Sequence, residues 1–600
     1  MANFNFKEKA DLIWDIAGLL RGDYKRSDYG KVILPLTVLR RLDAVLAPTK
    51  QKVLDFLPKV AKLSDSAKDL TLNKAAGYNF HNRSQFDFAK LVEDPANIAM
   101  NLRNYINGFS ANAREIIEYF NFDDQIDRMD DPKSDILFQV VKAFAEMKFD
   151  DVDSMQMGYI FEELIRKFAE QSNETAGEHF TPREVIELMV NLLFNTDREI
   201  FKEGIVKTLY DPACGTGGML SVGEKHLMSL NSEAKLELFG QEINPESYAI
   251  CKSDMLIKGD NPANIKFGNT FTVDGLREEK FDYMLSNPPF GVEWKKSAKT
   301  IKAEHESLGF AGRFGAGLPR INDGSLLFLQ HMISKMKSDG SRIAIVFNGS
   351  PLFTGQAGSG ESNIRQWIIE NDWLEAIVAL PDQLFYNTGI STYIWIVNNK
   401  KDDERKGYVQ LINATGTKDE VLIEEGKRDF NRFWDKMTRS LGNKRKIIVS
   451  GKDDRGIDYI TKLYGEYQEG EFVKILPNKY FGYWRVTVER PLMENGEVVT
   501  DSKGRPKADK ELRDTENIPF LREDAQGNLV PQSIDEYFER EVLPHVPDAW
   551  IDESKTKIGY EVNFTKYFYE FKPLRSLDAI RADILALEES SLELEKKVLL

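Results

Sequence analysis

The chain has 600 residues, more than one hydrophobic core usually holds, so several domains are expected. No apolar run is long enough to cross a bilayer, which excludes an integral membrane protein, and two cysteines are too few for a disulfide framework or a structural zinc site. The formal net charge of −16 argues against a protein that grips nucleic acid over its whole surface, because neutralising phosphates needs clustered Lys and Arg.

Residues 1–155 are predicted to form a helical N-terminal domain. The first twenty residues carry acids among the apolar ones and have no small-residue cleavage site, so we expect a cytoplasmic protein without a secretory signal. Apolar residues recur at spacings of three and four, as in Leu12, Ile13, Ile16, Leu19 and Leu20. Breakers between about residues 150 and 175 separate this block from the next domain.

Residues 156–400 are predicted to form a doubly wound α/β sheet. From Ile205 onward, short β-branched or aromatic runs alternate with helical ones, as in βαβ units. The predicted strands are Thr208–Tyr210, Leu236–Gly240, Ile265–Phe267, Phe281–Ser286, Arg342–Phe347, Trp373–Leu380 and Tyr393–Val397. Only breakers separate the last two, so we expect an antiparallel hairpin at the sheet edge.

The segment between Gly291 and Arg320 is rich in glycine and basic residues and has no sustained periodicity. It is predicted to be a long loop that becomes ordered when its basic residues meet phosphate groups. Residues 401–573 form a charged C-terminal extension. Residues 574–600 have the spacing of an amphipathic helix, expected to bind a partner; folding back onto its own domain stays open.

Two motifs follow predicted strands: Asp211-Pro-Ala-Cys-Gly-Thr-Gly-Gly218 and Ser286-Asn-Pro-Pro-Phe290. In open α/β sheets ligands bind beyond the carboxyl ends of the strands, so both motifs can face one crevice. The first motif is neither a dinucleotide fingerprint nor a P-loop, which favours a different nucleoside cofactor.

Glu242 follows the next strand and is the candidate for binding the ribose hydroxyls of that cofactor. The alternative is that Glu242 only caps the following helix. Cys214 lies inside the first motif and is interpreted as a small packed residue, which disfavours a thiolate mechanism. The histidines show no metal-ligand spacing, so no metal site is expected.

The set DPACGTGG, QEIN and NPPF resembles the S-adenosylmethionine-dependent amino-methyltransferases of DNA. The helical N-terminal block and the closing segment KIGYEVNFTKYFYEFKPLRSLDAIRADILALE further resemble the modification subunit of type I restriction-modification systems. The family's catalytic residues map here onto Asn287, Pro288, Pro289 and Phe290. Its cofactor-binding residues map onto Glu178, His179, Phe180, Thr181, Pro182, Arg183, Asp211, Gly215, Thr216, Gly217, Gly218 and Glu242.

The resemblance implies a Rossmann-like fold and methyl transfer from S-adenosyl-L-methionine to N6 of adenine in duplex DNA. Hydrogen bonds from the amine to the Asn287 side-chain oxygen and the Pro288 carbonyl would localise the nitrogen lone pair, and Phe290 would stack the extruded base. N4 of cytosine, RNA or a glutamine amide could use the same motif. A non-catalytic cofactor-binding scaffold is the alternative from another class.

The partners implied by the resemblance are double-stranded DNA and a separate DNA specificity subunit, with two copies of this chain for each specificity subunit. Whether a restriction (translocase and nuclease) subunit joins the same complex stays open. No membrane partner is expected. The helix from about Leu574 to Leu594 is the predicted docking element for the specificity subunit.

Overall fold

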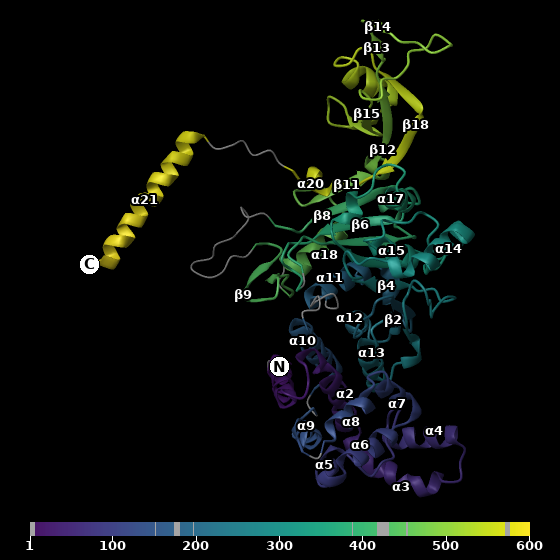
Figure 1. Ribbon diagram of the computed structural model, residues 1–600, viewed down its shortest axis with the longest axis vertical. Helices are drawn as coiled ribbons and strands as arrows, with labels where there is room; N and C mark the ends of the chain where they lie inside the picture. Colours follow the sequence, from purple (N-terminus) through teal and green to yellow (C-terminus); the bar gives the residue numbers. More distant parts are fainter. Residues whose placement is uncertain are drawn as a thin grey trace. The chain divides into compact units, whose positions relative to one another are not determined.

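The computed structural model describes residues 6–131, 133–149, 152–172, 181–195, 197–386, 388–416, 431–451, 454–569 and 576–599 (Figure 1). Three predicted cofactor residues, Glu178, His179 and Phe180, lie outside these ranges. The chain divides into two units, Met1–Val562 and Asn563–Leu600, and each is considered by itself. In the described ranges, no helix combines the length and the hydropathy that crossing a membrane requires.

The predicted N-terminal helical block is confirmed. Its helices are α1 (Phe6–Ile16), α2 (Gly30–Leu46), α3 (Lys50–Val60), α4 (Asp65–Ala76), α5 (Phe88–Leu91), α6 (Ile98–Asn107), α7 (Ala111–Glu118), α8 (Phe122–Met129), α9 (Ile136–Ala145) and α10 (Ser154–Ser172). Its core also takes in Ala249, Ile250 and Leu256 of α13 (Pro245–Lys258), a helix of the next domain. The two predicted domains therefore share apolar packing.

A sheet of nine strands follows, in the order β11-β8-β6-β7-β5-β4-β1-β2-β3 (Figure 1). Its strands are β1 (Val206–Asp211), β2 (Lys235–Glu242), β3 (Ile265–Phe267), β4 (Tyr283–Ser286), β5 (Arg342–Phe347), β6 (Leu374–Ala379), β7 (Tyr393–Asn398), β8 (Tyr408–Asn413) and β11 (Val473–Pro477). All seven predicted strands are present. Strands β1 to β5 pair in parallel, and the order reverses between β1 and β4, which is where such sheets bind ligands.

The predicted β6–β7 hairpin pairs antiparallel, but it does not lie at the sheet edge. Strand β7 lies between β5 and β6 and is antiparallel to both. Strand β8 pairs with β6 and β11 pairs with β8, so chain from beyond residue 400 completes the sheet. The charged segment that suggested a domain boundary is a connection within one sheet, in which Lys401 and Arg405 are buried.

Helices cover both faces of the sheet, as the doubly wound prediction required. On one face α11 (Arg183–Phe194), α12 (Gly218–Leu230) and α18 (Gly456–Glu466) share a core with alternate residues of β4 to β7. On the other face α15 (Ser325–Ser334) brings His331 to 3.0 Å from the Tyr210 hydroxyl. Helices α16 (Ser350–Phe353) and α17 (Gly360–Glu370) follow β5.

The prediction of a loop over residues 291–320 was wrong. Helix α14 (Ala298–Leu308) occupies its middle, with Ile301 fully buried against Phe271, Trp294 and Phe314. The lysines between the inward residues dilute the apolar periodicity of this short helix, which is why the sequence did not show it.

The rest of the first unit carries short strands: β9 (Asp435–Leu441), β10 (Lys444–Ile447), β12 (Gly482–Glu489), β13 (Met493–Glu494), β14 (Glu497–Val498), β15 (Asp514–Pro519), β16 (Leu521–Glu523), β17 (Leu529–Pro531) and β18 (Trp550–Tyr560), with α19 (Ile534–Tyr537). Strands β15, β12 and β18 form a separate sheet. Arg365 of α17, fully buried, donates to the Tyr560 carbonyl over 2.6 Å and anchors this sheet.

The second unit contains α20 (Phe564–Tyr567) and α21 (Leu577–Leu599). The predicted terminal helix is present as α21. Its apolar side chains are exposed within this unit, including Leu577, Ile584 and Leu587.

Candidate active site

The turn from β1 into α12 needs glycine at two positions. Gly215 and Gly217 have φ angles of +53° and +85°, in the left-handed region that other residues rarely adopt. A Cβ on Gly217 would also lie 2.8 Å from the Sγ of Cys251. The backbone therefore turns tightly and places the first turn of α12 at the carboxyl edge of the sheet.

Cys214 is a packed residue, as the sequence suggested. A hydrogen bond with Cys251, together with burial, raises the pKa of the Cys214 thiol. The thiolate that a nucleophile needs is therefore disfavoured here.

Glu242 ends β2 and is held by backbone donors. Its Oε2 accepts from the Gly215 amide at 2.8 Å, and its Oε1 accepts from the Asn244 amide at 2.7 Å. The carboxylate is only 7% exposed and faces the cavity described below. Each carboxylate oxygen keeps a second lone pair for a ligand hydroxyl. Asn244, not Glu242, caps α13, because its side chain accepts from the Ser247 amide.

Asp211 ends β1 and is almost fully buried. Its Oδ1 accepts from the Ala213 amide at 2.9 Å and from the Ser286 hydroxyl at 3.1 Å. Burial nevertheless raises the pKa of Asp211 to about 7, and the nearby Glu242 adds to that rise. The surroundings of Asp211, which include the nearby Glu242 carboxylate, therefore disfavour a negative charge on Asp211.

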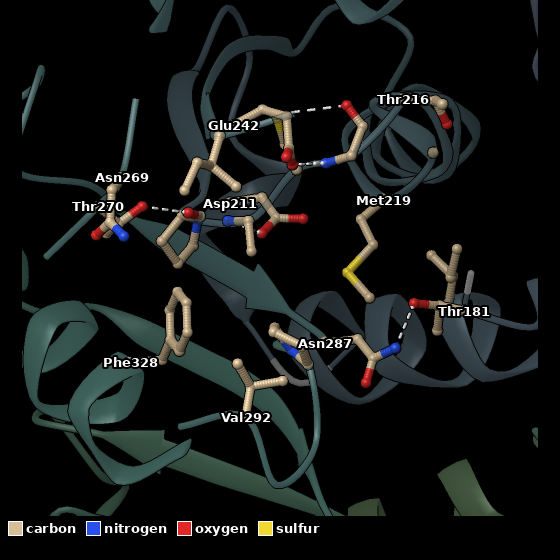
Figure 2. A pocket seen from close by; sticks show the side chains of 18 of the residues that line it. Thr181, Asp211, Thr216, Met219, Glu242, Asn269, Thr270, Asn287, Val292 and Phe328 are labelled. Atoms are coloured by element: carbon tan, nitrogen blue, oxygen red, sulfur yellow. Dashed lines mark hydrogen bonds between the residues drawn. The ribbon is translucent and has the colours of Figure 1, made fainter. Parts of the chain in front are cut away.

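A cavity of about 260 Å³ opens where these strand ends meet (Figure 2). The predicted residues that line it are Thr181, Asp211, Gly215, Thr216, Gly218, Glu242, Asn287 and Pro289. Side chains that the sequence did not indicate line it as well, among them Glu162, Met219, Asn269, Phe271, Val292 and Phe328. Most of them are apolar or carry no motif, so only the fold identifies them.

Asn287 lies directly after β4, and only one of the two polar atoms of its side-chain amide has a hydrogen-bond partner. Its amide nitrogen donates to the Thr181 hydroxyl at 2.9 Å, and Figure 2 shows the oxygen turned away from Thr181. That oxygen is buried, and no residue in the described ranges donates to it. An unpaired buried acceptor costs about 1–3 kcal/mol, so a donor from a ligand would be favourable here.

Arg183 lies behind the cavity rather than in its lining. Its Nη2 pairs with Glu162 at 2.6 Å, its Nη1 donates to the Gly218 carbonyl at 3.3 Å, and it stacks over Tyr159. Pro182, also predicted to bind cofactor, is the N-cap residue of α11. The two residues support the start of α11 and the start of α12.

Phe290 does not line the cavity. Its ring packs edge-on against Phe385, with ring centroids 5.8 Å apart, and is partly buried. Pro288 is buried, and its ring fixes φ in the loop after β4. Of the four predicted catalytic residues, Asn287 and Pro289 face the cavity.

Comparison with known proteins agrees with this geometry. Residues 152–440 match the N-6 DNA Methylase family, and residues 10–144 match the HsdM N-terminal domain. The type I restriction enzyme MjaIX methylase subunit of Methanocaldococcus jannaschii is 26% identical over 503 residues, covering 78% of this chain and 83% of that protein. The HindI methylase subunit of Haemophilus influenzae is 28% identical over 332 residues, covering 54% and 68%.

A solved structure has the same fold. It is the methyltransferase subunit of a type I restriction-modification system from Streptococcus thermophilus, with a TM-score of 0.60, 22% identity, and coverage of 79% of this chain and 97% of that one. Fold, site and family matches together define an adenine-specific DNA methyltransferase. The chain belongs to the modification subunits of type I restriction-modification systems. Cytosine N4 methylation and a scaffold role, which the sequence left open, are not favoured by these relatives.

Proposed function

We propose that this chain transfers a methyl group from S-adenosylmethionine to N6 of adenine in duplex DNA, within a site read by a specificity subunit. The observation that carries the proposal is the buried, unpaired oxygen of Asn287 at the end of β4. An exocyclic amine carries N–H donors and is a poor nucleophile, so an acceptor held in place is what it needs.

The residues of the cavity fit the proposed cofactor. Glu242, with a lone pair left on each oxygen, suits the two ribose hydroxyls. Thr216, in the turn before α12, and Gly218, its first residue, both line the cavity. Glycine suits position 218 because a Cβ there would lie 2.9 Å from the Glu162 Oε1. The predicted segment Glu178–Arg183 would complete this part of the site through Thr181. When bound, S-adenosylmethionine supplies an electrophilic methyl group on sulfonium sulfur.

Asn287 would act on the amine of the target base. Its Oδ1 and the Pro288 carbonyl accept the two N–H groups, which localises the nitrogen lone pair and aims it at the methyl group. The hydrogen bond to Thr181 keeps the amide from rotating, so that the oxygen rather than the NH₂ group meets the amine. The nitrogen can lose its proton after methylation, and no strong base is required.

Phe290 would capture the base. Taking a base out of the duplex costs a few kcal/mol, which stacking on an aromatic face helps to offset. The contact with Phe385 fixes the Phe290 ring before the base arrives.

The test is Asn287→Ala in the complex with the specificity subunit. We expect single-turnover methylation to fall about 10²–10³-fold, because removing one preorganised group at a developing charge costs that much. Cofactor affinity in calorimetry should stay unchanged. Asn195→Ala, at an exposed position just after α11, is the control and should methylate normally. Near-normal turnover by the Asn287 variant would refute the mechanism, and mass spectrometry of the product separates N6-methyladenine from N4-methylcytosine.

The proposed partners are the specificity subunit, with two copies of this chain, and a restriction subunit in the larger assembly. Helix α21 supports docking because its apolar side chains, such as Leu577 at 85% and Leu587 at 70% exposure, have little packing within their own unit. Removing residues 574–600 should abolish both co-purification with the specificity subunit and methylation, while cofactor binding persists. A truncated chain that still co-purifies and methylates would exclude α21 as the docking helix.

A further inference from the structure

The segment between the catalytic loop and α15 is an excursion closed at its base. The Trp294 amide donates to the Ile321 carbonyl at 2.9 Å, and the Gly324 amide donates to the Val292 carbonyl at 3.0 Å. Val292 lines the cavity and lies five residues after Asn287. Whatever this excursion carries is therefore attached directly beside the proposed reaction centre.

The inner face of the excursion packs against the cavity wall. Ile301 of α14 is fully buried in a cluster with Phe271 and Leu327, and Phe328 packs against the same cluster. Phe271 and Phe328 also line the cavity. The Asn269 side chain adds a hydrogen bond of 3.4 Å to the Ser297 hydroxyl. Helix α14 is thus held rigidly on the wall of the site.

The outer face of the excursion carries four exposed lysines: Lys295, Lys296, Lys299 and Lys302. Lys295 and Lys296 lie in the 3₁₀ turn Lys295–Ser297 that leads into α14, and Lys299 and Lys302 lie three residues apart on α14 itself. All four are exposed, whereas Ile301 is buried. In the described part of the chain, none of the four lysines forms an ion pair with a carboxylate. Glu293 is the only acid among residues 291–303. Of the two later acids on α14, Glu304 pairs with Arg313 and Glu306 is exposed.

The arginines of the same excursion are committed elsewhere. Arg313 pairs with Glu304 at 2.7 Å and donates to the carbonyls of Thr270 and Phe271, both at 2.8 Å. Arg320 donates to the Ser350 hydroxyl at 2.9 Å and lies 3.7 Å from Asp323. The excursion therefore uses its arginines to hold its own fold and leaves its lysines for something outside the chain.

We propose that Lys295, Lys296, Lys299 and Lys302 bind the phosphate backbone of the DNA next to the flipped adenine. The inference rests on the proposed function and names the surface that meets its substrate. From Lys295 to Lys302 the row spans about 12 Å, at roughly 2.0 Å per residue in the 3₁₀ turn and roughly 1.5 Å in α14, which is the axial rise of about three to four phosphates on one strand. A row of that length fits a polyanion better than a single small anion.

The row of four lysines also explains how a chain with a high net negative charge can bind DNA. A protein of net charge −16 repels DNA at long range, so it needs a local cationic surface where the duplex must lie. Each phosphate neutralised by lysine releases counterions and adds about 0.9 to the slope of log affinity against log salt. The contact is independent of sequence, which leaves sequence reading to the specificity subunit.

The experiment uses the full chain in complex with its specificity subunit. The variant is K295Q/K299Q/K302Q. The matched control is K202Q/K235Q/K400Q, which removes the same charge at the opposite, amino edge of the sheet, where β1 and β2 begin and β7 ends. Affinity for a cognate duplex is measured over a range of salt concentrations, together with kcat and KM for methylation.

We expect the row variant to lower the salt slope by up to about 2.7 and to raise KM for DNA, with kcat and cofactor affinity unchanged. The control should keep the wild-type slope, and K295R/K299R/K302R should restore it. A row variant with the wild-type slope would overturn the proposal, as would a row variant that only fails to assemble, since the row would then bind an acidic face of the specificity subunit. A wild-type complex that methylates no DNA would instead refute the proposed function.

Discussion

Two cavities of about 260 Å³ each lie at opposite edges of the nine-stranded sheet, and they differ in how their polar groups are paired. At the amino edge, Lys207 pairs with Glu199 at 3.0 Å and with Asp282 at 3.5 Å, and Arg342 pairs with Glu375 at 3.2 Å. The Nε of Arg342 at this edge is buried and has no described acceptor. At the carboxyl edge it is an acceptor, the Asn287 oxygen, that has no described partner. Size does not distinguish the two cavities, whereas the unpaired acceptor fits the carboxyl-edge cavity to a ligand that carries an N–H donor.

Two aspartates carry the same contrast. Asp211, at the end of β1, has its pKa raised by burial to about 7. Asp282, just before β4, is also buried, yet hydrogen bonds from Lys337 and Thr208 outweigh that burial and hold its pKa below the ordinary value. The hydrogen bonds at the amino edge stabilise the charged form of Asp282. Burial at the carboxyl edge destabilises the charged form of Asp211, which lowers the stability of the fold near neutral pH.

The largest expected effect is on stability against pH in Asp211→Asn. Since the folded pKa of Asp211 is raised, its contribution to stability is present below pH 4 and is lost as pH rises to about 7. The difference in unfolding free energy between the variant and wild type should therefore shift in favour of the variant, by up to about 4 kcal/mol, as pH rises from 4 to 8.

Asp282→Asn is the matched change at the other edge and should have the opposite sign. Because the pKa of Asp282 is lowered in the folded protein, its carboxylate stabilises the fold when the pH is above the ordinary pKa of an aspartate. The variant should therefore be less stable than wild type at pH 7 and approach wild type as pH falls toward 3. Denaturant titrations across pH measure both variants. Parallel pH curves for the two would remove the contrast between the edges.

The next largest effect is expected for Glu242→Ala. Cofactor affinity should fall about hundredfold, because a charged acceptor of two hydrogen bonds contributes about 1.5–3 kcal/mol. Calorimetry with S-adenosylmethionine measures it. Glu199→Ala, a surface acid at the amino edge, is the control and should bind normally. Unchanged affinity in Glu242→Ala would contradict the ribose assignment.

The smallest expected effect separates two roles for Thr181. Thr181→Val keeps the shape but removes the acceptor that holds the Asn287 amide, so kcat should fall about tenfold, the loss of one hydrogen bond. Thr181→Ser keeps the hydroxyl and should restore kcat. Cofactor affinity stays constant in both if Thr181 acts through Asn287, whereas a drop in affinity with constant kcat would make it a cofactor ligand only.

Much of the sheet was predictable because its strands are short apolar runs bounded by breakers. The position of β6 and β7 within the sheet was not predictable. Strands β8 and β11 follow the charged segment at 400–406, and only their pairing next to β6 in the folded sheet moves β6 and β7 away from the edge. Helix α14 was missed for the reason that makes it useful: lysines fill the positions between its buried residues.

The site followed the same division. Gly217, Glu242 and Asn287 could be named from motifs, because turns and strand ends impose residue types. The contact between Thr181 and Asn287 joins residues 106 positions apart, and Phe385, which holds Phe290, is almost as distant in sequence. Such contacts depend on the packing of whole elements and leave no local signal.

The core shared through α13 connects the N-terminal block to the proposed cofactor site. The helix begins three residues after Glu242, and its outer side is held by the block through Lys252 with Glu115 at 3.0 Å and Tyr248 with Tyr119 at 4.7 Å between rings. A shift of the block would move the support of Glu242, the proposed ligand of the ribose hydroxyls. Coupling between two binding sites is reciprocal. If a partner that binds this block raises the affinity for the cofactor, the bound cofactor raises the affinity for that partner by the same factor.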